Sequence, residues 1–294
     1  MRVYIIGSKG QLGGAFVDRF KASGWDYVAA DLDTLDITDA NAVMDALMAY
    51  RPALILNCAA YNLVDKAETE KEKAFAVNAE AVRTLALAAR KLEATLVHYS
   101  TDYVFDGTKG APYTEADKPN PLNVYGQSKL KGEEYARQAD GSLVLRLSWV
   151  FGKGQQNFIH KLLGWAKNPG PLKIAADEVS APSYAEDVVT ATLEALKAGL
   201  SGTWHLANTG SCSRYDWAKL VLKECGIEKE ILPARMADFN LAAKRPGYSA
   251  MSNEALTREL GITIPTWEEA VKRFIREEFT TETQRGMSSE EKIS

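Results

Sequence analysis

The chain has 294 residues, 46% of them apolar and 25% charged, which is the composition of an ordinary globular protein. Its net charge of −4 argues against a protein that mainly binds nucleic acid, although a local basic pocket for a phosphorylated small molecule is compatible with it. No apolar run approaches a membrane span, and Cys58, Cys212 and Cys225 lack metal or redox spacing, so we expect a cytoplasmic protein with reduced thiols, no membrane contact and no metal.

Short apolar runs alternate with helical patterns through the first half of the chain. We predict strands at 3–7, 27–31, 53–60, 95–100 and 143–152, separated by helices at 11–22, 40–49 and 77–91. Such alternation is typical of a parallel sheet covered on both faces. The predicted fold class is therefore α/β, a Rossmann-type doubly wound parallel sheet.

The rhythm changes after Gly152. A helix at 157–167, an extended piece at 171–184, a helix at 185–199 and a strand at 202–208 follow, and they predict a smaller C-terminal substrate-binding lobe over the carboxyl edge of the sheet. We predict a cofactor-binding domain at 1–150 to which segments near 183–210 return, a substrate-binding lobe at 151–280, and a polar, frayed tail at 281–294.

A glycine loop, GSKGQLG, follows the first strand directly and opens the first helix. Gly7, Gly10 and Gly13 suit a tight turn, the close approach of backbone N–H groups to a pyrophosphate, and close packing of helix on strand. The start of the helix adds partial positive charge. This context favours a dinucleotide site over a loop that uses glycine for turns alone.

The second strand ends at Asp31, where a carboxylate can bind the adenosine ribose and repel the extra phosphate of NADP. A turn residue is the alternative interpretation. Lys9 in the glycine loop could offset the repulsion, so NADH is favoured slightly and NADPH is not excluded.

Tyr125 and Lys129 lie one helical turn apart in the run YGQSK. A phenol is a poor acid near neutral pH, and an ammonium together with an oxidised nicotinamide would lower its pKa. Tyr125 could then protonate a ketone oxygen, and Lys129 could hold the nicotinamide ribose. A solvated helix face is the alternative.

A second donor for the ketone oxygen is expected at the carboxyl end of a strand. The run TLVHYSTD places Ser100, Thr101 and Asp102 there, although a turn or helix cap would use the same residues.

Longer motifs carry a resemblance to a known family. From GSKGQLG through AAYNLVDKAE, FAVNAEAV, STDYVFDG and NVYGQSK to KRPGYSAMS, the chain resembles the extended short-chain dehydrogenases/reductases, and within them the dTDP-4-dehydrorhamnose reductases, over nearly its whole length. The resemblance implies an oxidoreductase that uses NADPH or NADH to reduce the C4 ketone of dTDP-4-dehydro-L-rhamnose to dTDP-L-rhamnose. Its partner would be this small-molecule dTDP-deoxysugar, and the protein would be a monomer or homodimer.

The resemblance also implies roles for individual residues. Tyr125 and Lys129 match the catalytic pair, and Thr101 matches the residue that hydrogen-bonds the substrate carbonyl. Asp102 and Trp149 match substrate-pocket positions, with core filling at a strand end as the alternative for Trp149. Cofactor contacts are implied for Gly10, Gln11, Leu12, Asp31, Asp36, Ile37, Ala60, Tyr61 and Asn62.

Two charged positions keep alternatives. Val64 and Asp65 lie near the substrate in similar proteins, but Asp65 could equally cap a helix that starts there. Arg245 falls where the lobe should meet the nucleotide diphosphate, and a surface arginine without a partner is the alternative.

The chain also departs from the family pattern. Some members dimerise around magnesium held partly by an acidic residue on the first helix, where this chain has Ala15, so we predict no magnesium site of that kind. Glu178 and Ser180 stand where the family more often has glutamine and glycine, which leaves the substrate contacts there open.

Two other functions share the resemblance. A sugar-nucleotide epimerase or dehydratase would use the same tyrosine and lysine, and a non-catalytic regulatory subunit, like that of methionine adenosyltransferase, would bind cofactor only. The run STDYVFDG favours a reductase over the first, and the set Thr101, Tyr125 and Lys129 disfavours the second.

Overall fold

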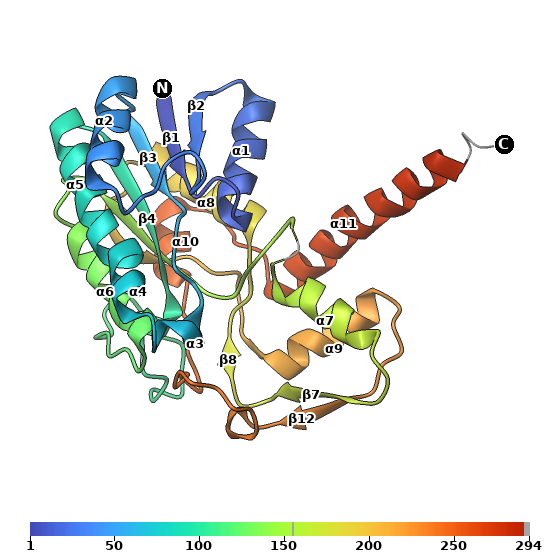
Figure 1. The fold of residues 1–294 in the computed structure, drawn as a ribbon. Helices are drawn as coiled ribbons and strands as arrows, with labels where there is room; N and C mark the ends of the chain where they lie inside the picture. Colours follow the sequence, from blue (N-terminus) through green and yellow to red (C-terminus); the bar gives the residue numbers. More distant parts are fainter. Residues whose placement is uncertain (155, 291–294) are drawn as a thin grey trace.

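A parallel sheet of six strands is the centre of the computed structural model, which describes residues 1–154 and 156–290, the last eleven as backbone only (Figure 1). The strand order is β10-β5-β4-β3-β1-β2, and all neighbours are parallel. The order reverses between β1 and β3, where doubly wound sheets bind ligands at the carboxyl ends of the strands. The predicted α/β Rossmann-type fold is confirmed. The strands are β1 (Arg2–Ile6), β2 (Asp26–Ala30), β3 (Leu54–Asn57), β4 (Thr95–Thr101), β5 (Leu143–Leu147) and β10 (Gly202–His205).

Helices cover both faces of this sheet (Figure 1). On one face α1 (Gln11–Ser23) and α8 (Ala185–Lys197) pack against β1, β4 and β5, and on the other lie α2 (Ala40–Tyr50), α5 (Ala81–Leu92) and α6 (Val124–Ala136). Burial of both faces explains the continuous apolar runs of the strands.

The predicted helix at 77–91 begins earlier than expected. It continues from α4 (Lys71–Phe75) through η1, a π-helical turn at Ala76–Glu80, into α5. Such a turn inserts one residue into the helix and often marks a functional region.

The single strand predicted at 143–152 is wrong. It divides into β5 and β6 (Val150–Phe151), because Trp149 adopts a φ of +44°, outside the extended region. Strand β6 pairs with β9 (Ser183–Tyr184) and so leaves the central sheet.

A smaller lobe lies beside the carboxyl edge of the sheet. It has its own apolar core, which includes Phe151, Trp217 and Phe274. Its elements are α7 (Phe158–Ala166), α9 (Arg214–Glu224), the start of α11 (Trp267–Glu290), the strand pair β7 (Leu172–Ala175) and β12 (Ile231–Ala234), and the strand pair β8 (Val179–Ser180) and β11 (Cys212–Ser213).

Part of the second half of the chain packs on the sheet. Besides α8 and β10, α10 (Glu254–Leu260) joins the sheet's core through Leu256, although its sequence lies in the range predicted for the lobe. The tail predicted as frayed is helical as far as Glu290, and residues 291–294 lie outside the described residues. None of the described helices combines the length and apolar character needed to cross a bilayer.

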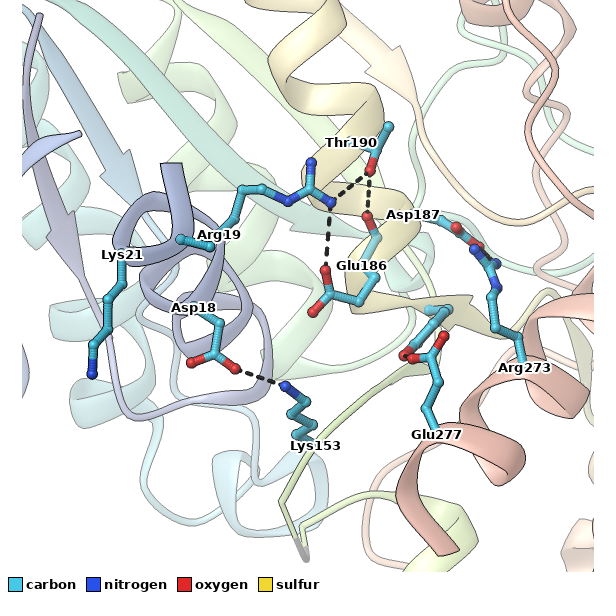
Figure 2. A pocket seen from close by; sticks show the side chains of 11 residues that line it. Asp18, Arg19, Lys21, Lys153, Glu186, Asp187, Thr190, Arg273 and Glu277 are labelled. Atoms are coloured by element: carbon cyan, nitrogen blue, oxygen red, sulfur yellow. Dashed lines mark hydrogen bonds and ion pairs between the residues drawn. The ribbon is translucent and has the colours of Figure 1, made fainter. Parts of the chain in front are cut away.

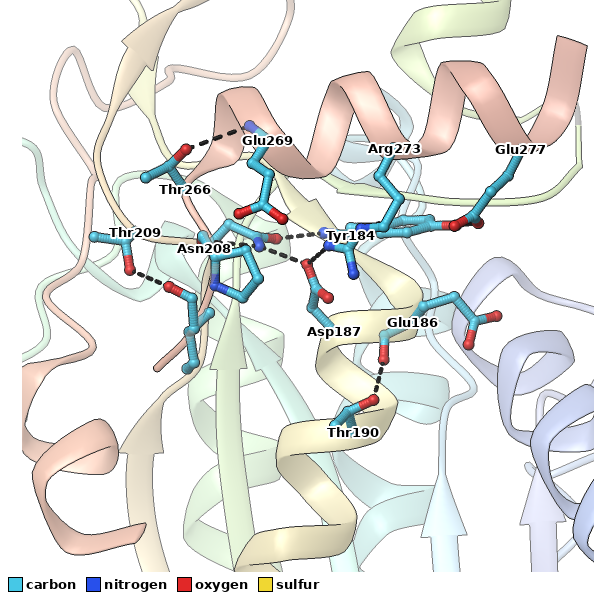
Figure 3. Close-up of polar contacts among 12 residues, drawn as sticks. Tyr184, Glu186, Asp187, Thr190, Asn208, Thr209, Thr266, Glu269, Arg273 and Glu277 are labelled. Carbon is cyan, nitrogen blue, oxygen red and sulfur yellow. Dashed lines mark hydrogen bonds and ion pairs between the residues drawn. The ribbon is translucent and has the colours of Figure 1, made fainter. Parts of the chain in front are cut away.

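The lobe is joined to the sheet's helices through α8 and α11 (Figure 3). Asp187 near the start of α8 accepts hydrogen bonds of 2.7 Å each from Arg273 of α11 and from Asn208. The side-chain oxygen of Asn208 in turn accepts the backbone N–H of Tyr184. This polar cluster ties the first turns of α11 to the start of α8.

A polar hollow opens between α1, α8 and α11 (Figure 2). Its charged side chains pair across it, since Lys153 lies 2.9 Å from Asp18 and Arg19 lies 3.6 Å from Glu186. The first contact ties the lobe's first loop to α1, and the second ties α8 to α1.

Candidate active site

The glycine loop folds as its spacing predicts. Gly7 has a φ of +78°, and a Cβ there would lie 2.6 Å from the backbone nitrogen of Ala59. A Cβ on Gly13 would lie 2.1 Å from the carbonyl oxygen of Gly7, so Gly13 serves the packing of α1 on the loop. Both positions therefore require glycine.

The first turn of α1 fits a pyrophosphate. Gly10 is the N-cap and offers no capping side chain, and the first turn holds no acidic residue. The first backbone N–H groups of the helix are therefore available to an anion, and the helix dipole favours one.

The end of β2 is engaged with the glycine loop. The carboxylate of Asp31 accepts the backbone N–H of Lys9 at 2.7 Å and also that of Leu32. The ammonium of Lys9 pairs with Asp33, not with Asp31. Asp31 thus helps to shape the loop beside its predicted role at the ribose, and the charge of Lys9 is partly offset.

The carboxyl ends of β1, β3 and β4 open into a cavity of about 650 Å³, which we call the inner cleft. Nearly all predicted cofactor and catalytic residues line it. Gly13, which packs behind the glycine loop, and Asp102 do not. The predicted lining residues are Gly7, Gly10, Gln11, Leu12, Asp31, Asp36, Ile37, Ala60, Tyr61, Asn62, Thr101, Tyr125 and Lys129.

Tyr125 and Lys129 project from the first two turns of α6. Asn123 caps this helix by accepting the N–H of Gly126 at 2.8 Å. Burial raises the pKa of Tyr125 to about 12, and a hydrogen bond with Thr101 lowers it by less. Burial also lowers the pKa of Lys129 to about 8, and its ammonium donates to the carbonyl oxygen of Tyr99. Lys129 alone does not lower the pKa of Tyr125, because burial dominates; the predicted lowering also invoked the charge of an oxidised nicotinamide.

Thr101 ends β4 and caps η2 (Asp102–Val104). Its hydroxyl accepts the backbone N–H of Tyr103 at 3.2 Å and donates to Asp102 at 3.0 Å. Asp102 is buried and also accepts hydroxyl hydrogen bonds from Ser180 and Ser249. Burial raises the pKa of Asp102 to about 6 against these three hydrogen bonds. Asp102 thus fixes the hydroxyl of Thr101 without lining the cleft itself.

Asn78 is a site residue that the sequence reasoning missed. It lies in the π-helical turn, accepts the backbone N–H of Tyr61 at 2.8 Å, and donates to the carbonyl oxygen of Tyr61 and to Ser128 of α6. It therefore fixes the segment 60–62 relative to the helix that carries Tyr125. A buried asparagine within an apolar helix was the available signal.

A second cavity of about 710 Å³, the outer cleft, lies between the sheet's edge and the lobe. It shares Asn62, Trp149, Val150 and Gln156 with the inner cleft, so the two are continuous. Its other walls carry aromatic rings and positive charges from the lobe: Phe158, Lys161, Trp165, Lys173, Arg214, Trp217, Phe239 and Arg245.

Arg245 lines this outer cleft and ties the lobe to the sheet domain. Its two terminal nitrogens bind the carboxylate of Asp65 at 3.1 and 2.6 Å. The alternative of a partnerless surface arginine is wrong. Asp65 also accepts the N–H of Ala243 and lies within α3 (Val64–Ala67), whose N-cap is Leu63, so Asp65 is not the N-cap there.

The comparisons with known proteins agree with this geometry. The profile of the RmlD substrate-binding domain family matches residues 1–280. The chain belongs to this family. The dTDP-4-dehydrorhamnose reductase of Salmonella typhimurium is 35% identical over 96% of this chain and 100% of its own length. The spore coat polysaccharide biosynthesis protein SpsK of Bacillus subtilis is 34% identical over 94% of this chain and 97% of its own.

Solved structures resemble this RmlD-family chain over nearly its whole length. The crystal structure of dTDP-4-dehydrorhamnose reductase from Bacillus anthracis in complex with NADP has a TM-score of 0.90 and 35% identity, covering 94% of this chain and 99% of that one. The Thermus thermophilus UDP-glucose 4-epimerase complex with NAD has a TM-score of 0.79 at 22% identity, covering 94% and 98%, and shares the fold. Among the described residues no group of three or more His, Cys, Asp and Glu could hold a metal ion.

Proposed function

We propose that this protein reduces the C4 ketone of dTDP-4-dehydro-L-rhamnose to dTDP-L-rhamnose with NADPH or NADH. The observation that supports this most is the meeting of Thr101 and Tyr125 in the inner cleft, which runs directly into a cationic outer cleft. The homologous reductases, one of them solved with NADP, support the same reaction.

The nicotinamide, when bound, supplies the hydride for the C4 carbon of the sugar. Tyr125 supplies the proton to the ketone oxygen, since its raised pKa keeps the phenol protonated at neutral pH. Thr101 positions that oxygen, and Lys129 holds the nicotinamide ribose. The predicted residues of the glycine loop, Asp31, Asp36, Ile37 and segment 60–62 bind the rest of the cofactor.

The outer cleft suits the anionic nucleotide part of the substrate. Among the described residues that line it, four side chains are cationic and a single one, that of Glu178, is a carboxylate. Trp149 lies where the two clefts meet, with its indole N–H buried and without a partner among the described residues. We propose that Trp149 packs on the sugar, that Asp102 contributes to the sugar pocket through Thr101, and that Arg245 orders the loop over the nucleotide.

We further propose that residues 1–150 with the segments near 183–210 act as the cofactor-binding domain and residues 151–280 as the substrate-binding lobe. A cytoplasmic location is proposed because all three cysteines are free thiols and the reaction needs reduced nicotinamide. The monomeric or homodimeric state of the protein stays a prediction.

The test is incubation of the protein with dTDP-4-dehydro-L-rhamnose and one equivalent of NADPH, and separately NADH. We expect the amount of nicotinamide oxidised, measured from its absorbance, to equal the amount of ketone consumed. Conversion of the sugar nucleotide without loss of absorbance would identify an epimerase or dehydratase, and cofactor binding without conversion a regulatory subunit.

A further inference from the structure

Arg214 occupies a defined place in the outer cleft that neither the motifs nor the comparisons assign. It is the first residue of α9, and its guanidinium carbon lies 3.6 Å from the centroid of the Trp149 ring and 5.3 Å from that of Phe158. Because Trp149 lines both clefts, the guanidinium lies against the ring that the cofactor and substrate cavities share. Its side chain is 22% exposed, so ligands in the outer cleft can reach it.

Glu178 fixes the orientation of this guanidinium. Its carboxylate accepts Nε of Arg214 at 3.2 Å and the hydroxyl of Tyr103 at 2.9 Å, and it is almost fully buried. Nε is the only side-chain nitrogen of Arg214 with a hydrogen-bond partner among the described residues. The two terminal nitrogens are therefore free to bind an oxyanion, in the forked geometry that suits phosphate.

Arg245 differs in this respect. Both of its terminal nitrogens already bind Asp65, so an anion would have to compete with a bidentate carboxylate. Of the two guanidinium groups in the outer cleft, Arg214 is the one poised to accept a new ligand.

We infer that Arg214 binds the diphosphate of the nucleotide sugar through its terminal nitrogens, and that Glu178 is a positioning residue that fixes the guanidinium over Trp149 while weakening diphosphate binding through its own charge. This inference rests on the proposed function and names the specificity element of its substrate site. The carboxylate keeps the guanidinium oriented, and its repulsion of the diphosphate favours product release.

The first test measures binding of dTDP and of thymidine by calorimetry, which separates the diphosphate from the nucleoside. Arg214→Ala should weaken dTDP binding by about 10- to 100-fold and leave thymidine binding nearly unchanged. Lys219→Ala is the matched control, because Lys219 is an exposed cation on the same helix outside the cleft, and it should bind dTDP like the wild type. Equal dTDP affinity in the Arg214→Ala and Lys219→Ala variants overturns the inference.

The second test reverses the direction of the effect, so that misfolding cannot imitate it. Glu178→Gln removes the charge but keeps a hydrogen-bond acceptor for Arg214, while the hydroxyl of Tyr103 can accept from the amide. It should tighten dTDP binding by about 3- to 10-fold. Glu178→Ala removes the group that orients the guanidinium, so it should weaken dTDP binding. A glutamine variant that binds dTDP no more tightly than the wild type contradicts the role of Glu178.

Failure of the proposed function has a different signature. If the wild-type protein neither binds dTDP nor consumes NADPH in the presence of the ketosugar, the proposed reductase function is refuted. A wild type that does both, with an unaffected Arg214→Ala variant, refutes only the inference.

Discussion

At the scale of single residues, burial sets the chemistry of the candidate site. Tyr125 and Lys129 were predicted to face each other on a helix, and both do line the inner cleft. Their pKa values move in opposite directions, to about 12 and about 8, because burial disfavours the charged form of each group. A phenol that keeps its proton is suited to donate it only when charge develops on the ketone oxygen.

Asp102 should make stability depend on pH. Its pKa is raised by burial from 3.8 to about 6, so its contribution to stability is complete below pH 3.8 and is lost as the pH rises through 6. The shift corresponds to about 3 kcal/mol. We expect Asp102→Asn to remove this loss, so that the difference in unfolding free energy between variant and wild type changes by about 3 kcal/mol between about pH 3.5 and about pH 7. Urea denaturation measures both free energies across this pH range. A difference between variant and wild type that does not change with pH would refute the burial effect.

At the scale of elements, α6 is held to the sheet by a buried ion pair. Glu133 on α6 is fully buried and accepts Nε and a terminal nitrogen of Arg146 on β5 at 2.8 and 2.7 Å. Because α6 also carries Tyr125, this pair fixes the position of Tyr125 relative to the strand.

Arg146→Ala should lower the free energy of unfolding by about 3–5 kcal/mol, because it leaves the carboxylate of Glu133 buried without its main partner. Arg137→Ala is the control. Arg137 contacts the same carboxylate at 3.3 Å from an exposed position, and its loss should cost less than about 1 kcal/mol. Chemical denaturation measures both, and similar losses in the two variants would contradict the assignment.

Most elements were predictable because period and length marked them clearly. The helix predicted at 11–22 and the strand at 27–31 differ from α1 and β2 by about one residue. The break at Trp149 was not predictable, because an apolar run such as LRLSWVFG has strand propensity throughout and only tertiary contacts impose a positive φ. The π-helical turn around Asn78 has no distinct periodic signal either.

At the scale of the whole molecule, the two clefts differ in how many of their residues could be predicted from the sequence. The inner cleft is built from short motifs at strand ends, each continuous in sequence, so its residues could be predicted. The outer cleft draws Lys161, Lys173 and Arg214 from three separate elements of the lobe. No local pattern joins these cations, and only the fold brings them together.

The junction between α11 and the sheet domain should depend on Asp187. Asp187→Asn keeps an oxygen that can accept from both Arg273 and Asn208, whose hydrogen bonds end on the same carboxylate oxygen, but it removes the charge that pairs with Arg273, so we expect a loss of about 1–3 kcal/mol in unfolding free energy (Figure 3). Glu186→Gln is the neighbouring control; its side chain is more exposed and lies 3.6 Å from Arg19 (Figure 2), so it should cost less than about 1 kcal/mol. Thermal and urea unfolding provide the comparison, and a tolerated asparagine would show that the charge of Asp187 does not hold the lobe.

The most direct test of the central claim compares Tyr125→Phe with Tyr135→Phe, a variant on the same helix whose hydroxyl binds Glu80 outside the cleft. We measure NADPH oxidation with dTDP-4-dehydro-L-rhamnose and, separately, the affinity for NADPH. Tyr125→Phe should lower turnover by about 10²- to 10⁴-fold with cofactor affinity nearly unchanged, while Tyr135→Phe turns over like the wild type. Turnover by Tyr125→Phe at the wild-type rate would contradict the account.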